Sequence, residues 1–328
     1  MQQLSEFIQH LKQHPRVVIQ AHDFPDQDAI ASAFALSHLF NVSGIDTLIV
    51  YSGIIDRIST ENMIKILNIP IFHWQDTDLS DSDIIVTVDG CVGEKNVTDL
   101  PGREIGVIDH HDVHPSSGLW FCDIRPEFGA TATIIYEYYM QLGITIPTPH
   151  VTALQIGLAI DTANLTRGFC QNDIAAFSYF HRHADQDIVG RVTRNSIQLH
   201  ELQYYQQVLA NVEISGRVAL AVLDNNIPKN MLGILADFLL ALEEVDSVII
   251  ASYADTVINL SLRSECSNTS VAQLVRRVVT EYGIGFGGGH SHMAGGIIRR
   301  ECLEKRFTEP SLSRIFLEAI DAGYHIPL

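Results

Sequence analysis

Residues 104–111 of the chain read EIGVIDHH. A short apolar run that ends in acidic and imidazole side chains is typical of a buried strand whose carboxyl end reaches a functional site. Runs of the same kind occur elsewhere in the first half of the chain, at residues 16–22 (RVVIQAH), 47–52 (TLIVYS), 83–90 (DIIVTVDG) and 119–124 (LWFCDI). Segments with helical periodicity lie between these runs. The pattern predicts an α/β domain built on a parallel sheet.

The second half of the chain predicts a smaller α/β domain. Its strand-like runs are RVALAVLD (217–224), DSVIIASYAD (246–255) and TVINLSLRS (256–264). Between the two halves, residues 173–210 combine helical periodicity with many polar residues, which is typical of a terminal helix followed by a helical linker. We therefore predict a catalytic domain at 1–188, a linker at 189–212 and a second domain at 213–328.

Composition narrows the class of protein. The chain has 328 residues, 46% of them hydrophobic and 18% charged, with no apolar run long enough to span a membrane. The N-terminus lacks the features of a secretory signal, so we expect a cytoplasmic protein without a membrane partner. Five widely spaced cysteines argue against a disulfide framework and against a zinc knuckle. The net charge of −18 argues against a general coat for long nucleic acid.

Acidic and imidazole side chains gather where the apolar segments end. The residues concerned are His22, Asp26, Asp28, Asp89, Asp109, His110, His111 and Asp161. Carboxylates beside buried apolar runs need a positive partner, and these segments contain almost no Lys or Arg. A mixed carboxylate and imidazole set suits Mn²⁺, with Fe²⁺ or Mg²⁺ as alternatives, and its size favours two ions. Taken alone, Asp26 or Asp28 could be a helix cap, and Asp89 could be a turn residue. His110 and His111 could be partly exposed histidines, and Asp161 could be a buried, hydrogen-bonded aspartate.

These motifs, in this order, resemble the DHH phosphoesterase family, which is named for Asp109, His110 and His111. The matching segments are HDFPDQDAIAS (22–32), VDG (88–90), the DHH itself, FGATATIIYEYY (128–139) and AIDT (159–162). In the second half, SLRS (261–264) and GGGHSHMAGG (287–296) resemble the DHH-associated C-terminal domain. The resemblance implies an active site in the cleft between the two domains.

The resemblance also implies roles for individual residues. One ion would be held by His22, Asp26 and Asp89, and the other by Asp28, Asp89, His110 and Asp161. Asp109 would orient a ligating imidazole, and His111 would face the substrate phosphate. In the second domain, Arg263, Gly288, Gly289 and His290 would bind phosphate away from the attacked one. Arg167, in the loop after Asp161, is a further candidate phosphate contact or a solvated surface residue.

The expected activity is hydrolysis of phosphodiesters or phosphomonoesters by two Mn²⁺-type ions. The substrates implied are short oligoribonucleotides, linear dinucleotides or 3′-phosphoadenosine-5′-phosphate, as in the nano-RNase branch of the family. A nucleotide-binding regulatory module without turnover and a single-strand exonuclease are the alternatives. Long duplexes are not expected as partners, and the chain could form a homodimer. Gln27, Met293 and the loop TANLTRGF (162–169) depart from the usual motifs, which leaves the natural substrate open.

Overall fold

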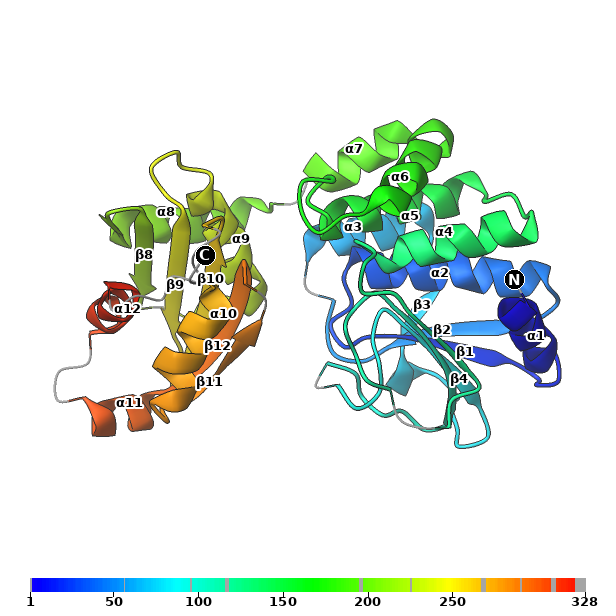
Figure 1. Ribbon diagram of the computed structural model, residues 1–328, viewed down its shortest axis with the longest axis horizontal. Coiled ribbons are helices and arrows are strands. Elements are labelled where there is room, and N and C mark those ends of the chain that lie inside the picture. The colour runs from blue at the N-terminus through cyan, green and yellow to red at the C-terminus, as the bar shows by residue number, and fades with distance from the viewer. Residues whose placement is uncertain are drawn as a thin grey trace. The chain divides into compact units, whose positions relative to one another are not determined.

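The computed structural model describes residues 2–55, 57–94, 96–115, 118–194, 197–224, 226–266, 270–289, 291–307 and 311–321. The chain divides into two compact units, Met1–Ile197 and Gln198–Leu328, each of which contains a sheet and helices (Figure 1). The predicted linker at 189–212 and the boundaries beside it stay predictions. Within the described residues, no helix has the length and apolar character that a membrane span requires.

The first unit is built on a sheet of six parallel strands among the described residues. In sheet order they are β3 (Ile71–His73), β2 (Thr47–Tyr51), β1 (Val17–Ala21), β4 (Ile84–Val88), β5 (Arg103–Asp109) and β6 (Phe121–Ile124). The chain adds β2 and β3 on one side of β1, and β4 to β6 on the other. The direction of strand addition therefore reverses between β1 and β4, which is where α/β sheets form ligand sites. The predicted parallel sheet is confirmed.

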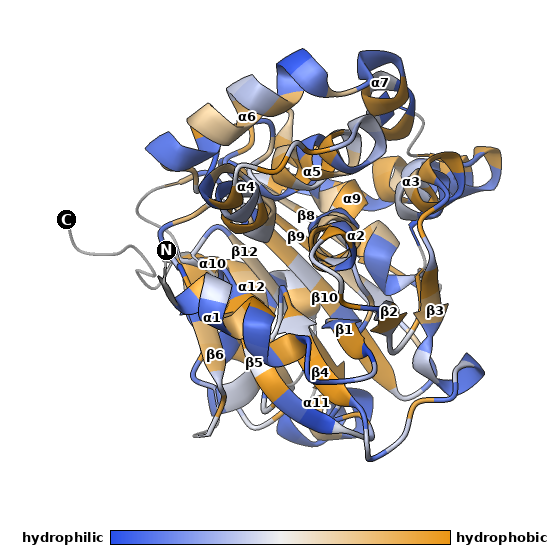
Figure 2. Cartoon of the chain, turned by 90° about the vertical axis from the view of Figure 1, so that its right-hand side faces the viewer, coloured by the Kyte–Doolittle hydropathy of each residue, from blue (hydrophilic) through white to orange (hydrophobic). Residues whose placement is uncertain are grey.

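Helices cover this sheet and bury its apolar side chains. They are α1 (Gln2–Leu11), α2 (Gln27–Val42), α3 (Ile58–Leu67), α4 (Thr131–Leu142), α5 (Thr148–Asp161), α6 (Gln171–His183) and α7 (Gln186–Arg194), with a 3₁₀ turn at Trp74–Asp76. In β1, Val17 and Ile19 face the main core, whereas Val18 faces a smaller cluster on the opposite side. Figure 2 shows that β1 and β4, the central strands of this sheet, are largely hydrophobic.

Close packing of α2 against α5 places two parts of the candidate site together. Helix α2 is buried on nearly all sides, which requires its neighbours to approach closely. On α5, a Cβ added at Gly157 would lie 2.9 Å from the Cα atom and from a carboxylate oxygen of Asp28. Only glycine allows this approach. Asp161 lies one helical turn after Gly157 and therefore on the same face of α5.

The second unit contains a mixed sheet. In sheet order its strands are β11 (Gly285–Gly289), β12 (Met293–Arg299), β10 (Val257–Ser264), β9 (Ser247–Tyr253), β8 (Val218–Leu223) and β7 (Val212–Ser215). The helical segments are a 3₁₀ turn at Leu199–Glu201, α8 (Leu202–Asn211), α9 (Lys229–Leu240), α10 (Val271–Val275), a π-helical segment at Arg276–Glu281, α11 (Arg300–Arg306) and α12 (Leu312–Asp321). Helices α8 and α9 contribute to one apolar core, and α10 and α12 contribute to the other.

The glycine-rich segment of the second unit, which includes two of the glycines expected to bind phosphate, consists largely of strands. Most of it forms the antiparallel strands β11 and β12, in which Gly287 pairs with Gly296 and Gly288 with Gly295. A Cβ at Gly287 would lie 2.6 Å from a methyl group of Val275, so this glycine allows a helix to pack on the strand. Local packing therefore accounts for part of the glycine content.

Candidate metal centre

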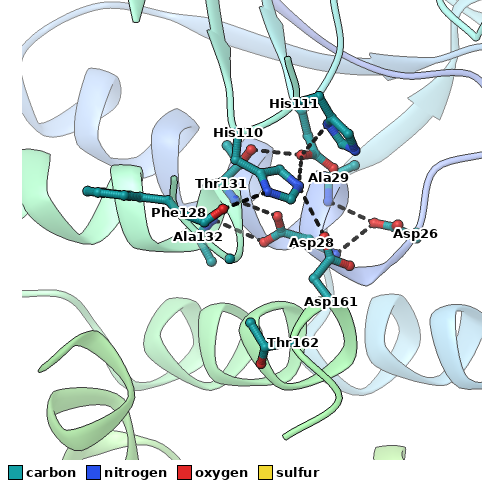
Figure 3. A network of polar contacts seen from close by, with 12 residues as sticks. Asp26, Asp28, Ala29, His110, His111, Phe128, Thr131, Ala132, Asp161 and Thr162 are labelled. Carbon is teal, nitrogen blue, oxygen red and sulfur yellow. Dashed lines mark hydrogen bonds and ion pairs between the residues drawn. The ribbon is translucent and has the colours of Figure 1, made fainter. Parts of the chain in front are cut away.

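The acidic and imidazole residues converge where β1, β4 and β5 end. His22 follows β1, Asp89 follows β4, and the DHH triplet lies at the end of β5 and just beyond it. Asp28 lies in the first turn of α2, Asp26 caps that helix, and Asp161 ends α5. Figure 3 shows Asp28, His110 and Asp161 pointing toward one another. The convergence expected from strand ends of a parallel sheet is therefore present in the first unit.

Among the residues that the structure describes, three overlapping groups of side chains could each hold a cation. In each group the potential ligand atoms lie within 4.8 Å of one another. The groups are His22 with Asp26 and Asp89, Asp28 with His110 and Asp161, and Asp89 with His110 and His111. The six residues expected to bind metal are all included. Asp89 belongs to two groups, as a bridging residue would.

Hydrogen bonds fix the rings of His22 and His110 in the orientation that metal ligation requires. Nδ1 of His22 lies 2.8 Å from the carbonyl oxygen of Asp23, and Nδ1 of His110 lies 3.1 Å from that of Phe128. A carbonyl oxygen can only accept, so each Nδ1 carries the proton and donates it. With a cation bound, each ring would be neutral and its unprotonated Nε2 atom would face the ion, as in metal-binding histidines.

The distances across the cluster fit intervening cations better than direct hydrogen bonds. Nε2 of His110 lies 3.3 Å from Asp161 and 3.6 Å from Asp89, and Nε2 of His22 lies 3.7 Å from Asp89. Adjacent ligands of an octahedral ion with bonds of about 2.1 Å are separated by roughly 3 Å. Oδ2 of Asp89 and Nε2 of His110 are buried and have no hydrogen-bond partner. Such atoms are costly unless a ligand satisfies them.

Helix ends hold the aspartates in place. One oxygen of Asp26 accepts the N–H groups of Asp28 and Ala29 and so caps α2. Asp28 accepts the N–H groups of Thr131, at 2.7 Å, and Ala132, at 3.0 Å, which open α4. The capping role considered for Asp26 from the sequence is therefore real, and it leaves Oδ2 of Asp26 outside these bonds. Capping and metal binding are compatible here because each carboxylate has several lone pairs.

Thr131 is a contributor that the sequence reasoning missed. Its hydroxyl donates to Oδ1 of Asp89 at 2.7 Å, and the hydroxyl is buried. The threonine lies in the segment FGATATIIYEYY, which was noticed as a motif without a role for its individual residues. The motif is visible in the sequence, but the contact between Thr131 and Asp89 depends on α4 beginning beside the end of β4. Thr131 therefore orients Asp89, the carboxylate that lies between His22 and His110.

The electrostatic state of the cluster also indicates a need for positive charge. Burial, together with the charges of Asp89 and Asp161, raises the pKa of Asp28 well above its usual range. Burial also raises the pKa of Asp161, to about 6, and the charge of Asp26 adds to the shift. Carboxylates brought this close destabilise each other's charged forms. Divalent cations would reverse that effect.

Asp109 holds the ring of His111. The resemblance implies that Asp109 orients a ligating imidazole, and its Oδ1 accepts from Nδ1 of His111, at 2.8 Å, and from the His111 backbone N–H, at 3.0 Å. His111 belongs to one of the groups that could hold a cation. The ring of His110 is held by Phe128 instead. The reason is local, because the chain turns after β5 and brings the residue two positions later onto the carboxylate. Asp109 therefore orients the histidine expected to face the substrate.

Two backbone features bring β1 and β4 close together at the site. Asp89 has a φ of 58°, a left-handed conformation that aspartate tolerates better than most residues. A Cβ at Gly90 would lie 2.9 Å from the Cβ of His22, so glycine is required for that approach. Strained positions of this kind cluster at functional sites.

The loop after Asp161 contains the remaining candidate of the first unit. Ala163, Asn164 and Leu165 have φ values of 48°, 59° and 60°, so three consecutive residues are left-handed. Arg167 follows them and is exposed. Its backbone N–H donates to the carbonyl of Thr162. The contact of Arg167 with phosphate stays a prediction.

The candidates of the second unit are in a different situation. Arg263 is buried, and its guanidinium donates to Asp237 at 2.8 Å, to Ser261 at 3.3 Å and to the carbonyl of Leu262 at 3.0 Å. A Cβ at Gly288 would lie 4.0 Å from Nε of Arg276, whereas a side chain at Gly289 would collide with the Met293 carbonyl. His290 lies outside the described residues. The phosphate-binding role of these four residues stays a prediction.

Comparison with known proteins identifies both units. The model described as "DHH family, N-terminal domain" matches residues 16–158, and that of the DHHA1 domain matches residues 215–309. The chain combines a DHH domain with a DHHA1 domain. The order of domains expected from the sequence motifs is therefore confirmed.

Two proteins are similar to this DHH–DHHA1 chain in sequence, and one solved structure shares its fold. An uncharacterized protein of Methanocaldococcus jannaschii is 29% identical over 307 residues, which cover 93% of this chain and 63% of that protein. A probable manganese-dependent inorganic pyrophosphatase of Bacillus licheniformis is 33% identical over 136 residues, 40% of this chain and 43% of that protein. The chain thus spans less than two thirds of the length of either relative. An exopolyphosphatase-related protein from Bacteroides fragilis shares the fold, with a TM-score of 0.78, 19% identity and coverage of 98% of this chain and 96% of that one.

Proposed function

We propose that this DHH–DHHA1 chain is a phosphoesterase that depends on two divalent cations, with Mn²⁺ as the preferred ion. The observation that carries the proposal is the position of Asp89, whose two oxygens face His22 on one side and His110 on the other. When bound, two such cations activate water and neutralise charge on a phosphoryl group. The name of the Bacillus licheniformis relative supports the choice of manganese.

The residues of the first unit divide into holders of metal and contacts of substrate. His22, Asp26 and Asp89 would hold one cation, and Asp28, Asp89, His110 and Asp161 would hold the other. His111 would contact the substrate phosphate, because its side chain is 42% exposed. Its Nδ1 proton is engaged by Asp109, which leaves Nε2 for the substrate. Asp109 thereby acts as the positioning group for His111.

The substrates proposed are small nucleotides. Arg263, Gly288, Gly289 and His290 of the DHHA1 domain, with Arg167 as a further contact, would bind a phosphate other than the attacked one. In this proposal the active site admits only short chains. The net charge of −18 adds repulsion for each extra phosphate, because no basic stripe offsets it. The proposed setting is the cytoplasm.

A length series tests this proposal. The experiment is a Mn²⁺-dependent time course on 5′-labelled RNAs of about two, five, ten and twenty nucleotides, with 3′-phosphoadenosine-5′-phosphate and a duplex alongside. We expect the highest kcat/KM on substrates of roughly two to five nucleotides or fewer, and no activity on the duplex. Equal kcat/KM on the shortest and longest strands would instead indicate a single-strand exonuclease. Nucleotide binding without any hydrolysis would indicate a regulatory binding module.

A further inference from the structure

Phe24 is an exposed aromatic residue in the segment that supplies two proposed ligands. It lies between His22 and Asp26 in the motif HDFPDQDA, two residues from each. Two residues of extended chain span at most about 7 Å, so the Cα of Phe24 is close to both. Its side chain is 61% exposed. A phenyl ring in such a position contributes little to the hydrophobic core.

The backbone at Phe24 is strained, and the surrounding loops fix it. Phe24 has a φ of 57°, a left-handed conformation that is unfavourable for a bulky residue. Its N–H donates to the carbonyl of Ser52 at 3.2 Å. The preceding residue, Asp23, donates its N–H to Asn96 and accepts from the backbone and the hydroxyl of Thr98. The structure therefore maintains an unfavourable conformation that leaves an aromatic ring exposed.

One side of the ring lies against a glycine. A Cβ added at Gly53 would lie 3.1 Å from two ring carbons of Phe24, and Gly53 itself has a φ of 77°. A side chain at this position would push the ring away, so glycine provides the space in which it rests. Ile54, which follows Gly53 in the sequence, is 64% exposed. An exposed aromatic side chain with a restrained backbone is thus carried by the segment that supplies His22 and Asp26.

We propose that Phe24 stacks on a nucleobase of the substrate and thereby selects nucleotides over inorganic phosphates. This inference rests on the proposed function, because it concerns the same site. Stacking on an aromatic ring favours any base, since every base has a π-face. Phosphate groups are charged and strongly hydrated, and they gain nothing from an uncharged ring. The part of the substrate next to Phe24 is therefore planar and uncharged.

The test measures binding, so that it does not depend on turnover. Calorimetry on the full-length, Mn²⁺-loaded protein gives the Kd for adenosine 5′-monophosphate and for inorganic phosphate. The key variant is Phe24→Asn, because asparagine tolerates a positive φ and lacks the ring. Phe24→Trp restores an aromatic face. Phe72→Asn is the matched control, since Phe72 is 47% exposed on the edge strand β3.

The inference predicts a selective loss. Phe24→Asn should raise the Kd for adenosine 5′-monophosphate by about 5- to 150-fold, the range for one stacked base, and should leave the Kd for phosphate unchanged. Phe24→Trp and Phe72→Asn should bind both ligands as the wild-type protein does, and manganese content should be equal in all variants. Equal weakening of both ligands, loss of manganese, or no change in either Kd would overturn the inference.

The outcome for Phe24 is separable from that for the proposed function. Selective loss of nucleotide affinity in a protein that hydrolyses none of the length series would support the stacking role and refute the phosphoesterase. Hydrolysis of short RNA by the wild-type protein, with nucleotide affinity unaffected by Phe24→Asn, would do the reverse.

Discussion

The candidate functional groups of the two units differ in whether their polar atoms already have hydrogen-bond partners. In the DHH domain, Oδ2 of Asp89 and Nε2 of His110 are buried without a hydrogen-bond partner. In the DHHA1 domain, the guanidinium of Arg263 already has three partners within its own unit. An unpartnered buried group indicates a ligand that completes the site. A partnered group requires a separate functional test, because its contacts already explain its position.

The largest effect should come from Asp89, which lies between His22 on one side and His110 on the other. Asp89→Asn should lose both cations and lower kcat/KM by about 100- to 1,000-fold or more, because charge stabilisation at the phosphoryl group is lost. Asp161→Asn should weaken mainly one cation. Metal analysis and activity assays check both expectations. Asp83→Asn is the control, since Asp83 is a buried carboxylate paired with Arg16 outside the site. Two cations retained by inactive Asp89→Asn would refute the bridging role.

The next effect concerns neighbouring threonines on α4. Thr131 donates to Asp89, whereas Thr133 donates to the buried Asp173 at 2.5 Å. Thr131→Val should weaken manganese binding by about 10- to 100-fold, as loss of an outer-shell hydrogen bond does. Thr133→Val should leave manganese affinity unchanged and lower the free energy of unfolding by about 1–3 kcal/mol, because a buried acceptor loses its partner. Manganese titration and denaturant unfolding distinguish them. The reverse pattern would mean that Thr131 only stabilises the fold.

Arg263 provides the corresponding test in the second unit. If it binds a substrate phosphate, Arg263→Lys should raise KM for short nucleotides by about 10-fold or more, the cost of a lost hydrogen bond to a charged group. Manganese content should not change. Asp237 is 59% exposed, so Asp237→Asn should alter the free energy of unfolding by less than about 1 kcal/mol. Steady-state kinetics with metal analysis measure the first effect. An unchanged KM in Arg263→Lys would restrict Arg263 to a structural role.

Alanine substitutions at two glycines of β11 distinguish a role in packing from a role in ligand binding. Gly289 has a φ of 142° and no room for a side chain, so Gly289→Ala should cost about 1–3 kcal/mol of stability. A Cβ at Gly288 meets no atom closer than 4.0 Å, so Gly288→Ala should change stability by less than about 0.5 kcal/mol. Thermal unfolding measures both. A stable Gly288→Ala protein with weakened nucleotide binding would assign that glycine to ligand access, and normal binding would remove it from the site.

His150 tests whether every unpartnered buried atom implies a ligand. Its Nδ1 has no hydrogen-bond partner, yet the ring stacks on Phe34 and lies outside the metal-binding groups. Burial, and then the charge of His38, lowers the pKa of His150 to about 4. The unfolded chain, with a histidine pKa near 6.5, therefore binds the proton more readily, and stability falls as pH drops from about 6.5 toward 4. His150→Phe should show a shallower loss of Tm between about pH 7 and pH 5. An unchanged slope would contradict the assignment.

The sequence predicted the first unit better than the second for physical reasons. Strands such as β4 and β5 are buried on both faces and therefore appear as continuous apolar runs. In contrast, β11 consists mostly of glycine, which has a low preference for strands, and only its pairing with β12 reveals it.

The same distinction applies within the metal centre. The proposed ligands could be expected together because the carboxyl ends of neighbouring parallel strands meet at one edge of the sheet. The contacts that orient these ligands could not be expected from the sequence. The Phe128 carbonyl reaches His110, and Thr131 reaches Asp89, only because α4 begins beside two strands distant in the sequence. Contacts of this kind depend on packing between elements, which local patterns do not encode.

The capping of α2 and α4 by the aspartates has a consequence for metal exchange. The N-terminus of each helix carries roughly half a positive elementary charge, and its N–H groups hold the carboxylates of Asp26 and Asp28 in position even without a cation. The site is therefore shaped before metal arrives, unlike small zinc domains that fold only around their ion. A chelator should strip the protein without unfolding it, and a different divalent ion should refill it directly. The ion bound in the cell then follows the local supply of free cations, and it need not be the ion that gives the fastest turnover.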